Sequence, residues 1–579
     1  MSKTPKYDAK VKEILDATEP GERVCELTGE KWVMTEEEIG WYKKFNVPPA
    51  KISPLTRWLM GGSYYVTNQW WWQKHPKTDK PLLTFVHPAT GIKVLPDAEW
   101  MDQDFVSEAR QIDPNRGLFD QLRDLQLAVP LMASRHSKKP ENSLALFSMG
   151  DTNSYFCLFT QSKHSLYSEW VFDLEDSMHV WGGRSITGSY FVLHSSRIYN
   201  SKFVHASYDC IDSSFLFDCR NCEKCFAATN KRNAKYIFFN KQLSKEGWEK
   251  RVAEIDFGDR KVLSEYRVRW RQLMDEEAIW PENFNIQAAD STGEYLNKVN
   301  GMHWCKNSHN NCHDCYYVDA GADQGSESAF CNCVVSSSRI FGSINAIHSA
   351  DMRYTQACND CQNLEYSMQC FNCENCFGCV GLNRKKYCIF NKQYSEDEYW
   401  QQVDELKCRM LDRGEYGQWF PLSMSPVYVF DSGGAVQFGA SREDLLRLGA
   451  KEYDPESCGA IGEDLVRQEA RNVSEVPDHI DELDPEEWAN IPLYDPEEKR
   501  RFALLKPEID FYQKHRLAPP NQHFIARTRA FEREMNTGTF IETDCHQCTH
   551  KVVVAENPTY KNRKIYCKAC YLKHLEKYG

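Results

Sequence analysis

Small or apolar residues recur at every third position through two long stretches of the chain, and this period constrains the fold more strongly than any other feature. The first series runs from Phe156 to Cys225 and contains no charged residue. In its later part, apolar and serine positions alternate, so that each set repeats every six residues. The two sets are Val180, Ile186, Val192, Ile198, Val204, Cys210 and Leu216, and Ser189, Ser195, Ser201, Ser207 and Ser213.

A second series with the same period runs from Cys331 to Cys379, 151 residues downstream. The two copies align without a gap at their ends. There the pattern Cys-x-Asn-Cys-Glu-x-Cys-Phe begins at Cys219 and again at Cys370, and Phe-Asn-Lys-Gln follows in both copies. The sequence therefore predicts an internal duplication.

A period of three fits neither common secondary structure. Three residues advance an α-helix by about 300°, so that the stripe drifts around the helix, and an ordinary strand has a side-chain period of two. A β-solenoid with short faces and regular bends can point every third residue inward and stack equivalent residues from turn to turn. We therefore predict β-solenoid segments over residues 150–230 and 305–383. A polyproline-like coil is the alternative, although neither segment contains proline.

Helices are expected after each copy and between the copies. Ser244 and Ser395 are N-cap candidates for helices that close the two copies, and Glu398 completes a capping box in the second. Residues 261–278 have the hydrophobic spacing of an amphipathic helix. The predicted fold class is mainly β with α, in which two duplicated β-solenoid segments are flanked by small modules of the zinc-ribbon or treble-clef type.

The chain has 24 cysteines, and many of them fall on the three-residue series. Equivalent positions in the two copies hold Ser207 and Cys358, or Ser213 and Leu364. Such interchange is typical of buried packing positions, because free cysteine packs as a small hydrophobic residue. A metal ion, an iron–sulfur cluster or a redox role is the alternative for one group. This group is Cys370, Cys373, Cys376 and Cys379.

Two Cys-x-x-Cys pairs near residue 579 have the spacing of a tetrahedral zinc site. The four predicted ligands are Cys545, Cys548, Cys567 and Cys570. The segment between the pairs predicts a β-hairpin with a turn at residues 556–558, and residues 569–575 predict a short helix. This order is that of a treble clef, with a zinc ribbon as the near alternative. Four protein ligands leave no open coordination position, so the expected cofactor is one structural zinc ion.

The first hundred residues contain a weaker copy of the segment that leads into this site. Residues 38–45 are similar to residues 508–515, and in both places prolines and then an arginine follow. The arginines are Arg57 and Arg527. Pro96 and Glu99 occupy the positions that align with the second cysteine pair of the zinc site. Cys25 is a single cysteine where the zinc site has a Cys-x-x-Cys pair. We therefore expect a degenerate module without metal.

Charge is divided unevenly along the last part of a chain whose net charge is −13. Residues 452–498 carry sixteen acidic and two basic residues, whereas residues 499–579 carry sixteen basic and eight acidic residues. A basic zinc module suggests contact with DNA or RNA. Alternatively, the acidic segment folds back to neutralise it, or the charges form a solvated face. The candidate nucleic-acid contacts are Arg527, Arg529, Arg533, Lys561, Arg563, Lys564 and Lys568.

Three features favour a cytoplasmic protein with reduced thiols. The sequence has no run of about 18 apolar residues that would suggest a membrane span. Its first residues lack the apolar segment of a secretion signal. Cysteines spaced by three residues are poor disulfide partners for one another in regular structure.

With these motifs in view, the chain resembles a family of uncharacterised cysteine-rich proteins that carry zinc ribbons and occur in candidate-phyla-radiation (Patescibacteria) bacteria. The resemblance rests on the duplicated Cys-x-Asn-Cys-Glu-x-Cys-Phe block, on Phe511-Tyr512 before a proline pair, and on the terminal four-cysteine module. The family has a Cys-Pro-x-Cys-Arg element after the prolines. Here that element is reduced to Ser53-Pro-Leu-Thr-Arg57 and to His523-Phe-Ile-Ala-Arg527. The resemblance implies a zinc module but no particular activity.

The domains predicted from these patterns follow one another along the chain. They are a degenerate metal-free module (1–145), a β-solenoid with its closing helix (150–252), a helical linker (253–300), a second β-solenoid with its closing helix (301–403), a turn-rich and acidic linker (404–498) and the basic zinc module (499–579).

The sequence is compatible with three functions. The first choice is a non-enzymatic zinc-binding scaffold or adaptor with a protein partner, because no P-loop, dinucleotide-binding fingerprint or open metal site is visible. The alternative is a nucleic-acid- or ribosome-associated factor that binds through the basic zinc module. The second alternative is an enzyme on a solenoid face. Its candidate residues in the first copy are His194, His205, Asp209 and Asp212.

Overall fold

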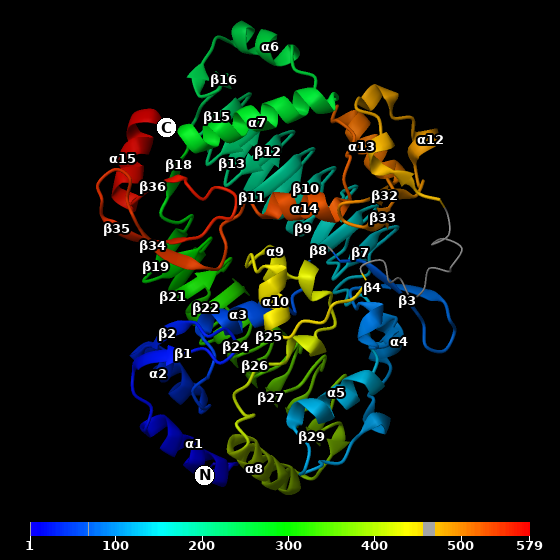
Figure 1. The fold of residues 1–579 in the computed structure, drawn as a ribbon, viewed down its shortest axis with the longest axis vertical. Coiled ribbons are helices and arrows are strands. Elements are labelled where there is room, and N and C mark those ends of the chain that lie inside the picture. The colour runs from blue at the N-terminus through cyan, green and yellow to red at the C-terminus, as the bar shows by residue number, and fades with distance from the viewer. Residues whose placement is uncertain (1, 68, 455–468) are drawn as a thin grey trace. The chain divides into compact units, whose positions relative to one another are not determined.

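The computed structural model describes residues 2–67, 69–454 and 469–579, and the chain divides into two compact units (Figure 1). Unit 1 combines Met1–Ala133, Asn285–Tyr453 and Gly538–Phe540. Unit 2 combines Ser134–Phe284, Asp454–Thr537 and Ile541–Gly579. Each unit thus joins one large, mostly parallel sheet to helices and small hairpins from distant parts of the sequence. The predicted class, mainly β with α, is confirmed. The acidic segment predicted over residues 452–498 lies partly outside the described residues.

Over most of its length, the sheet of unit 2 pairs each strand with the chain twelve residues further on. Val180 lies opposite Val192, Val192 opposite Val204, and Val204 opposite Leu216. Every pair is parallel except the last, β16 with β17. The strands are β7 (Leu144–Leu146), β8 (Tyr155–Lys163), β9 (Glu169–Glu175), β10 (Met178–Thr187), β11 (Tyr190–Tyr199), β12 (Lys202–His205), β13 (Tyr208–Ile211), β14 (Ser214–Phe217), β15 (Phe226–Thr229), β16 (Ile237–Phe238) and β17 (Lys241–Gln242).

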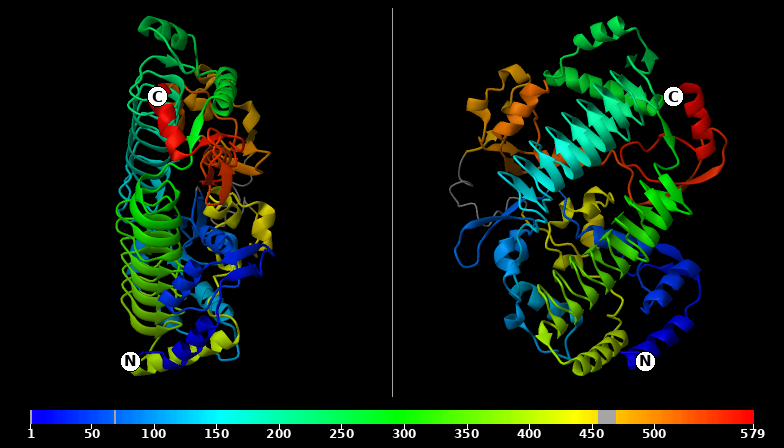
Figure 2. Two further views of the ribbon diagram at one scale, coloured as in Figure 1. Left: turned by 90° about the vertical axis from the view of Figure 1, so that its left-hand side faces the viewer. Right: turned by 180° about the vertical axis from the view of Figure 1, so that it is seen from behind.

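The sheet of unit 1 has the same register over most of its length. Ile340 lies opposite Met352, Leu364 opposite Cys376, and Cys376 opposite Cys388. Figure 2 shows the strands of each sheet following one another as a regular series of turns. The strands are β19 (Ile286–Ala289), β20 (Thr292–Glu294), β21 (Asn297–Lys306), β22 (His313–Ala322), β23 (Ala329–Val335), β24 (Ser338–Phe341), β25 (Ile344–Ile347), β26 (Ala350–Arg353), β27 (Gln362–Glu365), β28 (Glu374–Phe377), β29 (Lys386–Ile389) and β30 (Lys392–Gln393).

The three-residue period has a backbone cause. The residue before nearly every inward position has a left-handed conformation, as Asn200 (φ 44°) has before Ser201 and Phe203 (φ 59°) has before Val204. A left-handed residue between extended ones bends the chain, so each triplet makes one bend and four triplets make one twelve-residue turn. Ser201 and Val204 are 0% and 1% exposed. The prediction that this series points inward is confirmed.

The beginning of the predicted series is wrong. Phe156 and Phe159 themselves have positive φ values. Cys157 and Thr160, both 0% exposed, occupy the inward positions instead, although Phe159 is also buried. The pairing of β8 with β9 is irregular between Thr160 and Ser162. This irregularity changes the phase, so the inward series holds only from Ser162 onward.

Serine suits the interior because it bonds to the backbone of its own turn and of the next turn. The Ser201 hydroxyl donates to the carbonyl of Tyr199 (2.8 Å) and accepts the N–H of Ser213 (3.1 Å). Ser213 repeats this pattern with the carbonyl of Ile211 and the N–H of Cys225. An interior lined partly by hydroxyl groups therefore has its polar atoms satisfied.

A stack of aromatic rings runs along the outer surface of the unit 2 sheet. Its members occupy left-handed positions eleven or twelve residues apart, and successive ring centroids are 4.6 to 5.6 Å apart. They are Phe156, Tyr167, His179, Phe191, Phe203 and Phe215. Parts of α7 (Arg260–Glu276), α13 (Lys506–Lys514) and α14 (Phe524–Glu532) pack against this stack. The stack is therefore the main docking surface for the rest of unit 2.

Helices and small sheets complete both units. The predicted closing helices are confirmed as α6 and α8, with N-caps Ser244 and Ser395, and Glu398 completes the capping box of α8. The predicted amphipathic helix is α7. The helices of unit 1 are α1 (Pro5–Asp16), α2 (Glu36–Phe45), α3 (Pro54–Gly62), α4 (Asp97–Met101), α5 (Leu118–Ala128), α8 (Glu396–Asp412), α9 (Gly433–Val436) and α10 (Arg442–Arg447); those of unit 2 are α6 (Lys245–Ala253), α7 (Arg260–Glu276), α12 (Pro485–Trp488), α13 (Lys506–Lys514), α14 (Phe524–Glu532) and α15 (Lys568–Tyr578).

The small strands form short pairs and one three-stranded sheet outside the two large sheets. They are β1 (Gly21–Val24) with β2 (Lys31–Met34), β3 (Trp71–Lys74) with β4 (Pro81–Thr84), β5 (Val94–Leu95) with β6 (Leu131–Met132), β18 (Ile279–Pro281) with β36 (Lys564–Tyr566), β31 (Arg471–Asn472) with β32 (Leu493–Asp495) and β33 (Arg500–Phe502), and β34 (Phe540–Asp544) with β35 (Lys551–Ala555).

Replacing Ser201 tests the interior hydrogen bonds. Ser201→Val should lower the free energy of unfolding by about 2–4 kcal/mol, because it adds volume to a closed interior and leaves the Ser213 N–H without an acceptor. Ser201→Cys, which keeps a donor and a weak acceptor, should cost less than about 1 kcal/mol. The midpoint of urea unfolding, followed by circular dichroism, measures both. Equal costs would contradict the role given to the hydroxyl.

Candidate metal centre

Four cysteine side chains converge in unit 2. Cys545 and Cys548 lie in the turn between β34 and β35, whereas Cys567 is the N-cap of α15 and Cys570 lies in its first turn. The four Sγ atoms all lie within 4.8 Å of one another. The predicted ligands are thus brought together, and the group could hold one metal ion.

The backbone around Cys545 forms a tight knuckle. The N–H of Cys545 donates to the carbonyl of His550 (2.8 Å), and the N–H of Thr549 donates back to the carbonyl of Cys545 (2.9 Å). The N–H of Cys567 donates to the Cys545 Sγ (3.2 Å). Burial opposes ionisation of Cys545, but the backbone N–H groups aimed at its sulfur lower its pKa to about 6. These N–H groups stabilise a thiolate, the form that binds metal.

The hairpin predicted between the two cysteine pairs is wrong. The hairpin consists of β34 and β35, so the first pair occupies its turn. After β35, the Asn557 side chain accepts the N–H groups of Thr559 and Tyr560 and turns the chain. β36 then pairs in parallel with β18 instead of returning to β35. The helix predicted over residues 569–575 is confirmed as α15.

A buried polar contact fixes α15 to the sheet of unit 2. The Tyr571 hydroxyl donates to the carboxylate of Asp218, and Arg232 pairs with the same carboxylate at 2.9 Å. Asn230 also donates to Asp218 (2.9 Å) and bonds to the backbone of Ile279 in β18. The second cysteine pair is therefore held by the same residues that order the end of the sheet.

Three of the seven predicted nucleic-acid contacts are buried or paired with an acidic residue of the same protein. Arg527 is buried and pairs with Glu508 (3.1 Å). Arg563 is buried beneath the Trp280 ring and donates to backbone carbonyls. Arg529 pairs with Glu498. The remaining four, Arg533, Lys561, Lys564 and Lys568, are exposed, and Lys564 donates to the carbonyl of Glu276.

The knuckle turn recurs in unit 1 without its cysteine set. In the β1–β2 hairpin, the N–H of Cys25 donates to Glu30 and the N–H of Gly29 donates to Cys25. In the β3–β4 hairpin, the same two bonds involve His75, with Lys80 and Asp79 as partners. The backbone framework of the metal centre therefore exists where the chain lacks four thiols.

Side-chain hydrogen bonds connect the knuckle turn to a later helix in these two frameworks. Cys25 contacts the Thr56 hydroxyl (3.6 Å), which bonds to Ser53, the N-cap of α3. His75 bonds to Glu99 (2.7 Å) at the start of α4. The alignment of the two modules matches Glu99 with the second cysteine pair. It does not identify His75, because a histidine in place of a cysteine leaves no match in a search for Cys-x-x-Cys pairs.

Each unit also has a buried Glu–Tyr–Arg group that its large sheet helps to enclose. In unit 1, Glu38 accepts from Tyr42 (2.5 Å) and pairs with Arg57 (2.7 Å). Arg57 lies 3.6 Å above the Phe330 ring of β23. In unit 2 the corresponding residues are Glu508, Tyr512 and Arg527, and Tyr167 of the aromatic stack donates to Glu508 (2.8 Å). The similarity predicted between residues 38–45 and 508–515 thus corresponds to one shared buried contact.

The interior cysteines of the sheets also contact one another, as Cys373 contacts Cys361 and Cys376, but in the described part of the chain they form no group compact enough to hold an ion. Within the described residues, the group at Cys545 is the one set of three or more histidine, cysteine or acidic side chains with ligand atoms close enough to hold an ion. Cys361 instead donates to the carbonyl of Asn359 (3.1 Å) and accepts the N–H of Cys373 (3.4 Å), as an interior serine does. Burial raises the pKa of Cys361 well above its usual value, which keeps it a thiol.

The candidate catalytic residues of the first copy serve separate contacts. His194 packs against Trp181 (4.7 Å between centroids), Asp209 pairs with Arg197, and Asp212 accepts from Asn200. His205 lines a cavity beside α7. These four side chains therefore form no common site.

Comparison of the chain with protein-family models, curated proteins and solved structures gives no match. In the part of the chain that the structure describes, every helix is too short or too polar to cross a bilayer.

The buried Glu–Tyr–Arg group of unit 1 gives a test. Glu38→Gln should lower the free energy of unfolding by about 3 kcal/mol or more, because it leaves the Arg57 charge buried without its counter-charge. The exposed pair of Lys12 and Asp16 supplies the control, and Asp16→Asn should leave the urea midpoint unchanged. A Glu38→Gln midpoint equal to that of the control would contradict the assignment.

Proposed function

We propose that this protein is a zinc-binding scaffold that presents its sheet faces to a protein partner. The observation that carries the proposal is the four-thiol group at Cys545, whose Sγ atoms lie within 4.8 Å of one another. Four thiolates complete a tetrahedral shell and leave no position for substrate. A metal held in this way stabilises a fold and does not catalyse a reaction.

Zinc is the proposed metal because of the donor set. Four soft thiolates in a tetrahedral arrangement favour zinc over hard cations such as Mg²⁺ or Ca²⁺. The hairpin turn followed by a helix N-terminus supports a treble-clef or zinc-ribbon module. Cys548 is exposed and Cys570 is half-buried, so a metal ion can reach the four thiols from the solvent.

We propose further that both large sheets are β-solenoids and that they arose by duplication. The twelve-residue register and the inward small residue in every triplet support the first statement. The shared Cys-x-Asn-Cys-Glu-x-Cys-Phe blocks support the second. Stacked turns give long lateral faces, which repeat proteins use to bind partners. The buried reduced thiols suit a cytoplasmic location, and membership of the cysteine-rich family from candidate-phyla-radiation bacteria remains part of this proposal.

The nucleic-acid alternative has less support. Arg527 and Arg563 are buried, and Arg529 has an acidic partner. No described cluster of the candidate catalytic residues favours an enzyme. The scaffold is therefore the function that the geometry supports best.

Metal analysis tests the zinc centre. The purified full chain should contain one zinc per chain by elemental mass spectrometry, and Cys567→Ser should abolish it, because three thiolates and a hydroxyl bind zinc far more weakly. Cys373→Ser, which removes an interior thiol, is the matched control and should retain one zinc. Loss of metal in the control, or more than one ion in the wild type, would contradict the assignment.

A partner experiment tests the scaffold. The full chain, isolated from cells after nuclease treatment, should retain a protein partner in a fixed stoichiometry, and the same partner should bind when both proteins are purified separately. Binding that nuclease abolishes would favour the nucleic-acid alternative, and a chain that elutes alone would contradict the scaffold.

A further inference from the structure

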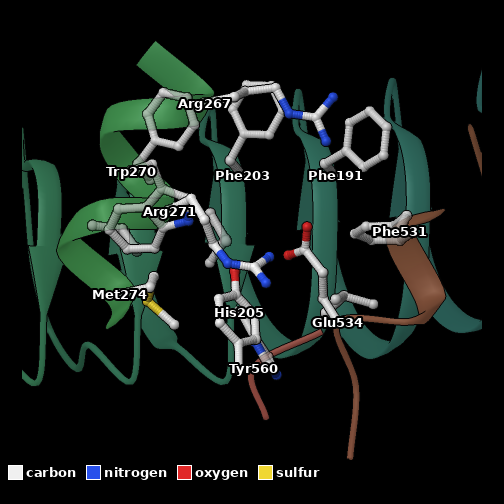
Figure 3. Close-up of a pocket in the computed structure, with 14 residues that line it drawn as sticks. Phe191, Phe203, His205, Arg267, Trp270, Arg271, Met274, Phe531, Glu534 and Tyr560 are labelled. Carbon is white, nitrogen blue, oxygen red and sulfur yellow. The ribbon is translucent and has the colours of Figure 1, made fainter. Parts of the chain in front are cut away.

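A cavity of about 120 Å³ lies within unit 2, between the aromatic stack and α7. Phe191, Phe203 and Phe215 of the stack form one wall, and Trp270 of α7 and Phe531 of α14 form others (Figure 3). A comparable apolar cavity of roughly 150 Å³ holds one benzene ring. The size and the walls therefore suit a single aromatic ring.

The cavity also contains charged groups. Arg267 lies 5.8 Å from the centroids of both Phe191 and Phe203, and Arg271 lies 4.2 Å from the Tyr560 ring. Figure 3 shows the carboxylate of Glu534 and the guanidinium of Arg271 directed toward the same space in front of the sheet. Arg267 is exposed, so it stands where a small molecule can enter.

The charge balance at this cavity favours an anion. Two arginines and one carboxyl group line it. Arg271 also pairs with Asp275 (3.6 Å) and donates to the carbonyl of Thr559, so Arg267 is the cavity's main open cation. Burial raises the pKa of Glu534 although both arginines act to lower it. A carboxylate on a ligand would gain charge-assisted hydrogen bonds from guanidinium groups that have planar, forked donors. Its ring would replace water against the aromatic walls.

His205 supplies an independent observation. It lines the cavity, is 6% exposed, and its Nε2 has no hydrogen-bond partner within the described residues. Burial lowers the pKa of His205 to about 3, so the ring is neutral. A buried polar atom without a partner costs free energy, and a hydroxyl group on a bound ring would satisfy it.

We propose that this cavity binds a small monocyclic aromatic acid, with its carboxylate at Arg267 and Arg271 and its ring between the aromatic stack and Trp270. A ring hydroxyl would bond to His205. This site is separate from the metal centre and does not depend on the scaffold function.

The test uses the full metal-loaded chain and 4-hydroxybenzoate as the probe, with affinity measured by titration calorimetry. The wild type should bind one molecule per chain. Arg267→Met with Arg271→Met should weaken binding by about tenfold or more, since two charge-assisted contacts are lost. Arg269→Met lies on the same helix, where Arg269 contacts Glu265, Phe239 and Tyr266, and should bind as the wild type does.

Two further measurements separate loss of binding from loss of fold. Glu534→Gln should bind the probe more tightly than the wild type, because it removes a competing carboxylate, and a damaged fold could not give that gain. Benzyl alcohol, which has the ring but no charge, should bind at least tenfold more weakly than the acid. Absence of saturable binding, equal binding by the double variant, or equal binding of benzyl alcohol would each overturn the proposal.

Discussion

The hydrogen bonds that interior side chains make to the backbone of successive turns are the interaction on which the rest of the structure depends. Each triplet contains a left-handed residue, and for most L-residues this conformation costs on the order of 1 kcal/mol. The cost recurs through both sheets, as at Asn200 and Phe203. Ser201 and its equivalents help to offset it by joining the carbonyl two residues back to the N–H twelve residues ahead. A short hydroxyl side chain can make both bonds at once, which explains why serine recurs among the inward positions of the period of three.

This constraint also separates the two kinds of cysteine in the chain. Cys361 occupies an interior position, makes the two bonds that serine makes, and stays a buried thiol. Cys545 lies in a hairpin turn, where backbone N–H groups aimed at its sulfur favour the thiolate. The same Cys-x-x-Cys spacing therefore has different chemistry on a bent strand and on a knuckle. The hydrogen-bonded pair of His75 and Glu99 shows that the knuckle framework also persists without thiols.

The sequence indicated which residues point inward, because burial follows the period directly. It did not indicate four triplets per turn, since a period of three is compatible with any number of bends. It misplaced Phe156 and Phe159, because the irregular pairing beside Thr160 leaves no mark in a pattern of small residues. The hairpin of the metal centre was also misassigned, because β36 pairs with β18 from a distant part of the chain. The cavity could not be predicted for the same reason, since its walls come from four separate segments.

Thiol labelling of the native, metal-loaded protein tests the central claim most directly. Interior cysteines of unit 1 such as Cys361 and Cys373 should react with a thiol reagent only at the rate of unfolding. Chelation of the metal, which lies in unit 2, should leave the labelling rates of these two cysteines unchanged. Mass spectrometry of the labelled peptides identifies each site. Rapid labelling of Cys373 in the folded protein, or protection that disappears when metal is removed, would show that these cysteines are ligands or reactive groups and would contradict the account.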